Sequence, residues 1–289
     1  MEIVAPGSQE QQQPKDFVMI TPETVKLKTD KIALIDADFI KYFVCNAIKK
    51  DIENKRAYIF EDTAKKYTQE YINMILDSFE CPGYIFCFSG NSSNTFRSAV
   101  AFEKKYKGTR TYEPLYDGEL QDKTTSIRYI RDRYPTLLYR DLEADDILSM
   151  LQDDETFIYS RDKDLLQIPG THYSLETGQF VEMTKEHSFQ FLMKQMITGD
   201  VVDNIPGIVG IGEVGAEKIL TNVKGTEALM AVLKAYFEKE KSLFNGIDAF
   251  VESWNLLRLR NKRGTYFQSR YQSAFDVLQM IKLNAKKNE

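Results

Sequence analysis

Short apolar runs alternate with helix-like segments over the first 160 residues, and this alternation constrains the fold more than any other feature of the sequence. Each run has the length of a buried strand, and the runs lie at residues 32–36, 84–89, 136–139 and 156–160. Helical patterns occupy residues 61–80, 94–106, 122–134 and 143–152. Strands that alternate with helices predict an α/β fold, with a mostly parallel central sheet and helices on both of its faces.

The chain divides into three regions by composition. Residues 1–30 are polar and Gln-rich, which is typical of a flexible tail. Residues 31–183 form the predicted α/β core. Residues 184–289 have helical patterns apart from a Gly-rich turn at 207–215. We therefore predict an α/β domain followed by a helical C-terminal part.

Composition disfavours several classes of protein. No apolar run is long enough to span a membrane and no signal-peptide pattern is present, so we expect a cytoplasmic protein. Three cysteines without metal-type spacing argue against a disulfide framework. Two histidines in the whole chain argue against a zinc site or a His-based triad. The net charge of −5 at first disfavours a nucleic-acid partner.

Carboxylates follow the predicted strands, and in one segment a predicted helix, at the points where these elements end. Ligands in such sheets bind beyond the carboxyl ends of the strands, so these side chains are expected to meet at one edge. Eight of them are candidates: Asp36, Glu143, Asp145, Asp146, Asp162, Asp164, Asp200 and Asp203. Without these eight the net charge changes from −5 to +3, so the acidic total does not exclude DNA.

A group of carboxylates without a cation either raises its own pKa values or destabilises the fold. A divalent metal relieves this repulsion, and all-oxygen ligand sets suit Mg²⁺ or Mn²⁺. Two such ions can clamp the attacking and leaving oxygens of a phosphodiester. A first helical turn favoured by the helix dipole is the alternative for residues 143–146 alone. The joint occurrence of four acidic segments favours the metal site.

A Gly-rich segment has the composition of a phosphate-binding turn. Gly207, Gly210 and Gly212 precede a predicted helix whose first amides can hold a phosphate, and Lys218 lies further along that helix. Tight turns and helix ends also use glycine, so the turn alone is weak support. Its position directly after the last two acidic candidates strengthens the interpretation.

The segment 102–110 surrounds Tyr106 with four basic residues, Lys104, Lys105, Lys107 and Arg110. Positive charge with an interleaved aromatic ring suits single-stranded or frayed nucleic acid, which needs both charge and a stacking surface. A solvated basic helix end is the alternative. The basic cluster at 258–263 is equally open to both interpretations.

Five motifs, in this order, resemble those of the 5′-nuclease (flap endonuclease) superfamily: "LIDAD", "KYKGTR", "LEADDI", "SRDKDLLQI" and "GDVVDNIPGIVGIG". That superfamily includes the 5′-nuclease domain of bacterial DNA polymerase I and the stand-alone bacteriophage 5′→3′ exonucleases. The resemblance covers about residues 31–222, and the compact length is similar to that of a phage enzyme. It implies a PIN-like core and a structure-specific 5′→3′ exonuclease or flap endonuclease of DNA replication or repair.

The resemblance also implies roles for individual residues. It assigns metal ligation, direct or through water, to Asp36, Glu143, Asp145, Asp162, Asp164 and Asp200. Asp146 and Asp203 would support these ligands. Lys107 and Arg97 would steady the scissile phosphate, and Tyr106 would lie near the unpaired 5′ nucleotide.

Cofactors and partners follow from the same resemblance. It implies two Mg²⁺ or Mn²⁺ ions, and K⁺ in a helix–three-turn–helix at about residues 199–222 that grips duplex backbone. Residues 107–130 would form an arch or gateway for a 5′ strand. The expected partner of this monomer is branched, nicked or 5′-ended duplex DNA, or an RNA–DNA hybrid, in a host cytoplasm if the chain is phage-encoded.

The sequence departs from the superfamily at one point and leaves two alternatives open. The superfamily usually carries an acidic residue ahead of its "FR", where this chain has Ser89, Gly90 and Asn91. One metal ligand is therefore missing or replaced. A PIN-type ribonuclease is the first alternative, although a duplex-gripping turn is superfluous for cutting single-stranded RNA. A structure-specific DNA-binding protein with reduced activity is the second, and the retained carboxylates argue against it.

Overall fold

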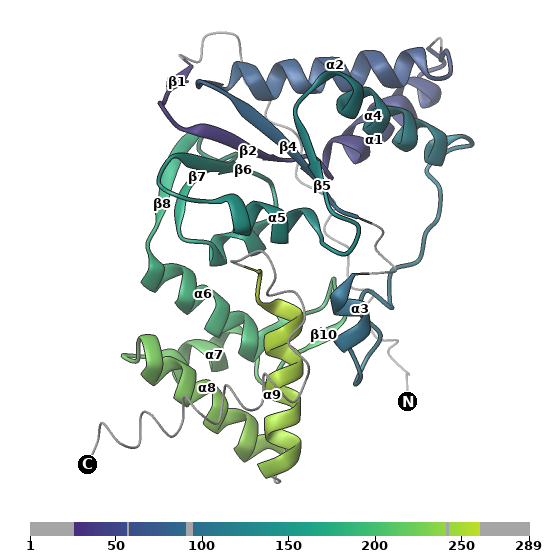
Figure 1. Ribbon diagram of the computed structural model, residues 1–289. Helices are drawn as coiled ribbons and strands as arrows, with labels where there is room; N and C mark the ends of the chain where they lie inside the picture. Colours follow the sequence, from purple (N-terminus) through teal and green to yellow (C-terminus); the bar gives the residue numbers. More distant parts are fainter. Residues whose placement is uncertain (1–25, 57, 91–94, 241–242, 261–289) are drawn as a thin grey trace, which may run out of the picture.

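A six-stranded sheet forms the centre of the computed structural model, which describes residues 26–56, 58–90, 95–240 and 243–260 (Figure 1). In spatial order its strands are β5 (Thr136–Leu138), β4 (Tyr84–Phe88), β2 (Ile32–Asp36), β6 (Thr156–Tyr159), β7 (Gly170–Ser174) and β8 (Gln179–Met183). Neighbouring strands are parallel except for the antiparallel pair β7 and β8. The predicted α/β fold with a mostly parallel sheet is confirmed.

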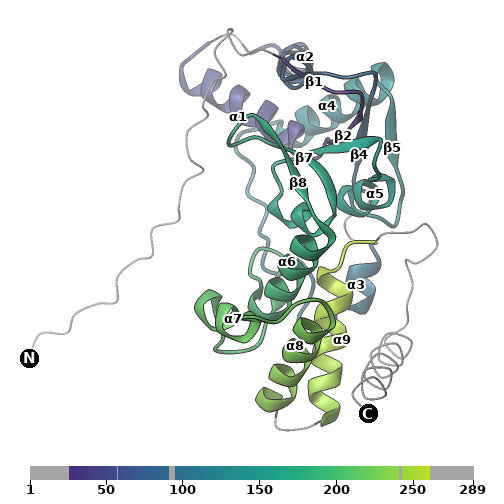
Figure 2. The same cartoon turned by 90° about the vertical axis from the view of Figure 1, so that its left-hand side faces the viewer.

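Successive residues of the central strands pack on opposite faces of the sheet, as the period of two in a strand requires. Ile35 of β2 lies in a buried cluster with Ile72, whereas its neighbour Leu34 lies in another with Ile147. The first cluster belongs to the face covered by α1 (Ile40–Glu53), α2 (Asp62–Asp77) and α4 (Glu119–Arg133). The second belongs to the face covered by α5 (Ala144–Leu151), as Figures 1 and 2 show. Helices on both faces are therefore confirmed.

The sequence pattern located the four predicted strands but missed other elements. The helix predicted over 94–106 is the short α3 (Phe96–Val100). The pattern missed α1 altogether, and it also missed β7 and β8, which extend the sheet beyond β6. In addition, β1 (Leu27–Lys28) pairs in parallel with β3 (Phe79–Glu80). The described structure thus begins inside the segment predicted as a tail, and residues 1–25 lie outside it.

The helical part has an apolar core of its own and lies below the sheet in Figure 1. It contains α6 (Lys185–Thr198), α7 (Glu213–Leu220), α8 (Gly225–Glu240) and α9 (Leu243–Leu257). The strand pair β9 (Gly199–Asp200) and β10 (Ile205–Pro206) lies between α6 and α7 in the sequence. The helical prediction from residue 184 is thus confirmed up to residue 257, with this hairpin as an interruption. Residues 261–289, and with them half of the basic cluster at 258–263, lie outside the described residues.

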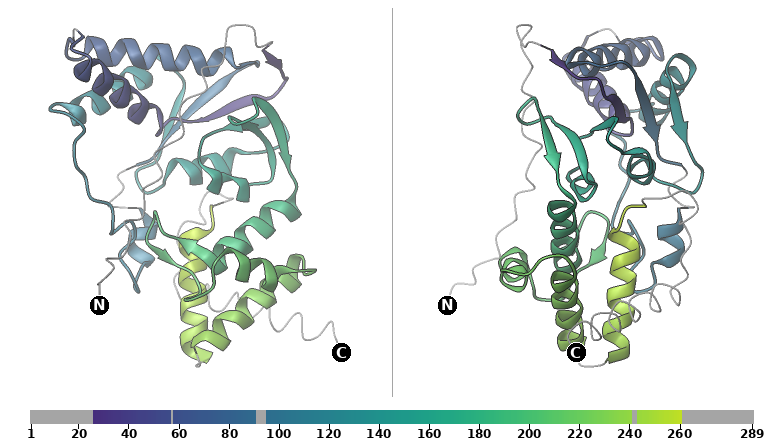
Figure 3. Two further views of the ribbon diagram at one scale, coloured as in Figure 1. Left: turned by 180° about the vertical axis from the view of Figure 1, so that it is seen from behind. Right: turned by 60° about the vertical axis from the view of Figure 1, so that its left-hand side comes forward.

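The predicted gateway at 107–130 is only partly a loop. Residues 119–130 belong to α4, which packs against α1 and α2. Residues 101–118 have no helix and run along the side of the molecule from α3 to α4 (Figures 1 and 3). The segment predicted as a gateway therefore consists of this loop and the first part of α4, and its role as a gateway stays a prediction. Among the described residues, no helix combines the length and apolar composition needed to cross a membrane.

Candidate metal and nucleic-acid site

The acidic candidates meet at the carboxyl edge of the sheet. Asp36 ends β2, and Asp162 follows β6 as the cap of the 3₁₀ helix Lys163–Gln167. Asp145 lies in the first turn of α5. Burial, followed by the charges of Asp162 and Asp36, raises the pKa of Asp145 well above its ordinary value. Three segments far apart in the sequence therefore place their carboxylates close enough to repel one another.

Burial and mutual repulsion perturb the neighbouring carboxyls in the same direction. Burial and then the charge of Asp38 raise the pKa of Asp36 to about 7. Burial, followed by Asp162 and Asp200, raises the pKa of Asp164 to about 7. Among the described residues, five of the eight candidates form no ion pair, and we call them the uncompensated carboxylates: Asp36, Asp145, Asp162, Asp164 and Asp200.

The other three candidates, Glu143, Asp146 and Asp203, are held by cations, and we call them the paired carboxylates. Arg97 contacts Glu143 at 3.0 Å and Lys107 contacts the other oxygen of the same carboxylate. Burial acts to raise the pKa of Glu143, but Arg97 and Lys107 together lower it below its ordinary value. Glu143 is therefore stabilised as an anion without added metal.

Arg97 does not occupy the position that the resemblance implied. Its side chain is 2% exposed and binds Asp146 through two nitrogens, at 2.6 and 2.9 Å. Its Nε donates a hydrogen bond to the carbonyl of Leu256. The predicted contact of Arg97 with phosphate is wrong, because the guanidinium is enclosed between α3, α5 and α9. Asp146 is fully buried against Arg97, so it does not face a metal directly, and its predicted role in supporting the ligands stays a prediction.

Tyr106 is also buried rather than available to a nucleotide. It is 6% exposed, and its hydroxyl lies 2.8 Å from oxygens of both Glu143 and Asp203. The prediction that its ring lies near an unpaired nucleotide is therefore wrong. The exposed aromatic rings of this loop are those of Phe102 and Tyr112, which are 51% and 58% exposed. Tyr106 instead joins α5 to the β9–β10 hairpin.

Lys107 and Arg110 lie on the rim of the acidic edge, where both pair with carboxylates. The backbone of Lys107 is left-handed, with a φ of 53°, and its N–H donates to the carbonyl of Asp203. Its side chain is 23% exposed, with Nζ 3.7 Å from Asp203 and in contact with Glu143. Arg110 is 49% exposed and pairs with Asp203. Both cations can therefore reach a phosphate that approaches this edge.

The donor set has the right chemistry for a hard divalent cation, although its side chains are spread apart. Within the described residues, no three Asp, Glu, His or Cys side chains lie closely enough to hold one ion. Burial and then mutual repulsion raise the pKa values of four of the uncompensated carboxylates, so the gathered charges are unfavourable without a cation. Carboxylate oxygens that form no ion pair among the described residues are donors that fit Mg²⁺ or Mn²⁺.

The three glycines of the predicted phosphate-binding turn differ in whether the structure requires glycine at their positions. A Cβ on Gly207 would lie 2.3 Å from the carbonyl of Ile197, so this glycine is required by the close approach of the β9–β10 hairpin to α6. Gly210 has a φ of 83°, which favours glycine. A Cβ on Gly212 would meet nothing within 4 Å. Only Gly212, at the start of α7, is thus free of a structural requirement.

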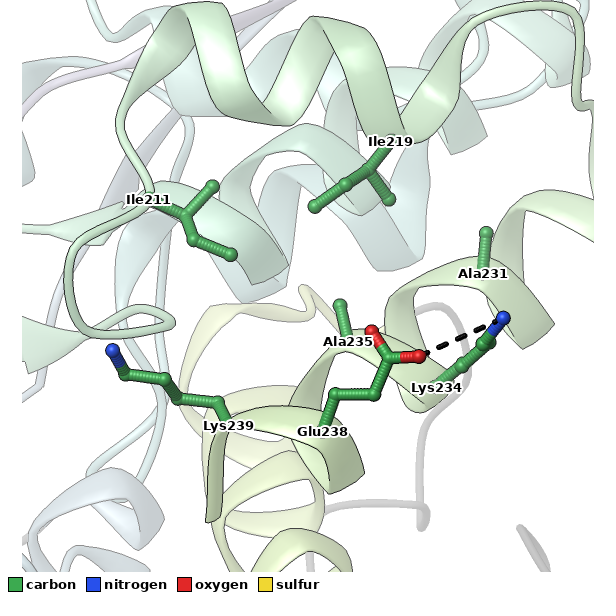
Figure 4. Close-up of a pocket in the computed structure, with 7 residues that line it drawn as sticks. All are labelled: Ile211, Ile219, Ala231, Lys234, Ala235, Glu238 and Lys239. Carbon is green, nitrogen blue, oxygen red and sulfur yellow. Dashed lines mark ion pairs between the residues drawn. The ribbon is translucent and has the colours of Figure 1, made fainter. Parts of the chain in front are cut away.

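Lysines from two helices lie beside this turn. Lys218 is exposed on α7, and Nζ of Lys239 on α8 lies 3.6 Å from the position of a Cβ on Gly210. A shallow cavity of about 400 Å³ separates the turn from α8, with Ile211 and Ile219 on one side and Lys239 on the other (Figure 4). Lys239 is distant in the chain and belongs to no motif, so the sequence alone did not indicate it. A helix–three-turn–helix stays a prediction.

Two further residues of the acidic edge were missed. Ser160 donates a hydrogen bond to Asp36 at 2.7 Å and accepts one from the backbone of Asp162. Asp38 lies beside Asp36 and accepts a hydrogen bond from the backbone of Ser89. The doubled aspartate in "LIDAD" was a visible signal for Asp38.

No protein-family model matches the chain. A 5′-3′ exonuclease of Mycoplasmopsis pulmonis is 27% identical over 228 residues, which are 72% of each chain. DNA polymerase I of Borreliella burgdorferi is 32% identical over 176 residues, which are 52% of this chain and 19% of the polymerase. This chain therefore spans about a fifth of that polymerase.

A solved structure shows the same fold. The T5 5′-exonuclease with bound divalent metal ions (zinc) superimposes with a TM-score of 0.54, over 86% of this chain and 99% of that chain, at 18% identity. The identity is low, so this likeness concerns the fold alone. The resemblance of the chain to the 5′-nuclease superfamily is therefore confirmed. It rests on the five motifs in order, on the sequence similarity to an exonuclease and to DNA polymerase I, and on this shared fold.

Proposed function

We propose that this chain is a metal-dependent, structure-specific 5′→3′ exonuclease or flap endonuclease that hydrolyses DNA phosphodiesters. The observation that carries the proposal is the set of uncompensated carboxylates gathered at one sheet edge, beside the partly exposed Lys107. The similarity to a protein named 5′-3′ exonuclease supports the reaction. The neighbour with divalent metal ions supports the cofactor class.

The uncompensated carboxylates are the proposed ligands of two Mg²⁺ or Mn²⁺ ions, and Glu143 would join them when Lys107 moves to a phosphate. When bound, such ions lower the pKa of water and neutralise charge on phosphate oxygens. Among the described residues, no histidine lies with these carboxylates. No imidazole is therefore available there to act as a general base. Ser160 orients Asp36, and Asp162 accepts a hydrogen bond from the backbone of Asp164.

The cations on the rim have separate roles in this proposal. Lys107 offsets the negative charge that develops on the scissile phosphate, since a positioned cation in a partly buried site stabilises such charge strongly. Arg110, which is more exposed, holds the neighbouring phosphate. The amides at Gly212, with Lys218 and Lys239, bind the backbone of the duplex part of the substrate.

The finer assignments belong to the same proposal. The substrate is branched, nicked or 5′-ended duplex DNA, or an RNA–DNA hybrid, and the enzyme acts as a monomer in replication or repair. K⁺ would bind at the turn 207–212. All three cysteines are free thiols, which supports a reducing cytoplasm.

A substrate panel tests the proposal directly. A 5′-labelled flap DNA, a matched nicked duplex and a single-stranded RNA are each incubated with the protein in Mg²⁺ or in EDTA, and product lengths are read. We expect Mg²⁺-dependent products that end near the flap junction or at the 5′ side of the nick. Degradation of the RNA alone would favour the ribonuclease alternative. Binding of flap DNA without cleavage would favour the DNA-binding protein of reduced activity.

A further inference from the structure

The described residues at the end of β4 contribute no carboxylate, and the backbone there leaves no room for a side chain at one of the positions. A Cβ on Gly90 would lie 2.3 Å from the carbonyl oxygen of Tyr139 and 2.4 Å from that of Arg140, so no side chain fits there. The hydroxyl of Ser89 accepts a hydrogen bond from the backbone of Ala144 at 2.9 Å. Ser89 therefore satisfies the first amide of α5.

Asp38 fills this part of the edge from the neighbouring strand. It lies two residues beyond the end of β2, and its Oδ2 accepts a hydrogen bond from the N–H of Ser89 at 3.1 Å. Its own N–H donates to Oδ1 of Asp36 at 3.0 Å. The Asp38 carboxylate thus lies between the ends of β2 and β4, beside Asp36, which is buried at the end of β2.

Lys41 is the partner of Asp38 in the metal-free structure. The ion pair joins Nζ of Lys41 to Oδ1 of Asp38 at 2.9 Å, and the two side chains are 18% and 25% exposed. A partly exposed ion pair contributes little net stability, because water screens it. The pair is weak and partly exposed, so it can open when a divalent cation competes for the carboxylate.

We propose that Asp38 binds divalent metal together with Asp36, and so supplies from β2 the carboxylate that the segment after β4 lacks. This inference rests on the proposed function, because it adds a ligand to the same site. Its rival is a purely structural role, in which Asp38 only ties the β2–α1 turn to Ser89 and Lys41. The two roles differ in what happens to metal affinity when the charge is removed.

Mn²⁺ titration, followed by electron paramagnetic resonance of the free ion, measures that affinity without any substrate. Asp38→Asn removes the charge but keeps an oxygen that can accept from Ser89. We expect it to weaken Mn²⁺ binding at least about tenfold, as the loss of a supporting or ligating carboxylate does. Asp153→Asn is the matched control, because Asp153 also accepts a backbone N–H but precedes β6 at the opposite edge of the sheet.

Relocating the carboxylate gives a sharper test. Aspartate caps helices as well as serine does, so Ser89→Asp can keep the hydrogen bond to Ala144. The double variant Asp38→Asn/Ser89→Asp then carries a carboxylate at the same junction, and we expect it to recover most of the lost Mn²⁺ affinity. Should Asp38→Asn fail to fold, Lys41→Gln decides the matter, because freeing Asp38 must tighten Mn²⁺ binding if Asp38 is a ligand.

The outcomes separate the inference from the function on which it rests. Wild-type Mn²⁺ affinity in Asp38→Asn, with loss of binding in Asp36→Asn, would overturn the role of Asp38 and leave the proposed function intact. No Mn²⁺ binding by the wild-type protein would overturn both. Unchanged affinity in Lys41→Gln would likewise count against Asp38 as a ligand.

Discussion

The paired and the uncompensated carboxylates share one edge of the sheet but differ in their surroundings. Glu143, Asp146 and Asp203 each contact an arginine or a lysine. The uncompensated set has no such partner among the described residues, and four of its five pKa values are raised by burial and by one another. Carboxylates of one motif can therefore have opposite functions: the first set stabilises the fold, and the second is unfavourable until a cation arrives.

Asp145 and Asp146 show this contrast between adjacent residues. Both lie in the first turn of α5, but they project from the helix in directions about 100° apart. Asp146 faces Arg97 and the helical part of the molecule, whereas Asp145 faces Asp36 and Asp162. The helix thus sorts its two aspartates into different environments, and motif matching cannot distinguish them.

The largest effect is expected from breaking the paired set. Arg97→Ala leaves Asp146 buried and without its cation, and such a loss costs about 3–5 kcal/mol in the free energy of unfolding. Chemical denaturation measures this change. Arg140→Ala, on the exposed loop before α5, is the control and should change the free energy of unfolding by less than about 0.5 kcal/mol. A stable Arg97→Ala protein with only its cleavage rate reduced would contradict the structural role.

The next largest effect concerns the adjacent aspartates. Asp145→Asn should lower the cleavage rate at least about 100-fold, as expected for a lost metal ligand, and should raise the melting temperature in EDTA because one repelling charge is gone. Asp146→Asn should lower that melting temperature, since the buried Arg97 loses one of its two carboxylate partners. Thermal unfolding in EDTA and the flap-cleavage rate measure both. Melting temperatures that move in the same direction would remove the distinction between the two sets.

The sequence was sufficient to predict the central strands of the sheet and the edge at which the carboxylates gather. Buried strands have a short-range signature, and parallel strands bring their carboxyl ends together whatever their loops do. The partners of each side chain were not predictable, because they come from distant segments. Arg97 contacts residues of α5 and α9, and nothing in "NTFR" indicates which carboxylate an arginine will meet in the folded chain.

The surroundings of Tyr106 were not predictable for the same reason. An aromatic residue among lysines has the local pattern of a stacking surface, but its hydroxyl is drawn to two carboxylates from other segments. Asp38, in contrast, was visible in the sequence and was passed over. A count of carboxylates at strand ends does not show that the turn after β2 folds back over the end of β4.

A smaller effect is expected from pH. The pKa values of Asp36 and Asp164 are raised to about 7 in the folded protein, against about 4 in an unfolded chain. Between these values the folded state binds more protons, so stability in EDTA should rise as pH falls from 8 to about 5. For a domain of this size, a change of 1 kcal/mol in the free energy of unfolding shifts the melting temperature by about 2–4 °C. We therefore expect the melting temperature to rise by at least about 4 °C over this pH range.

Divalent metal should cancel this dependence. Added Mn²⁺ replaces protons as the neutralising charge, so it should raise the melting temperature more at pH 8 than at pH 5. In Asp36→Asn/Asp164→Asn both the pH dependence and the Mn²⁺ effect should shrink. A melting temperature that falls steadily from pH 8 to pH 5 in EDTA would mean that the paired carboxylates dominate the titration.

The smallest expected effect separates the acidic edge from the Gly-rich turn. Gly212→Val places a side chain in open space at the N-cap of α7, so it should lower stability only modestly, through the poorer cap, but should hold a phosphate away from the backbone amides. The loss of one such hydrogen bond costs about 1 kcal/mol, or about fivefold in duplex affinity. Gly83→Val is the matched control, since its Cβ also meets nothing within 4 Å and it lies at the amino end of β4. Fluorescence anisotropy with labelled duplex DNA in EDTA measures both variants. Equal affinities would place the duplex elsewhere and leave Lys218 and Lys239 without their proposed ligand.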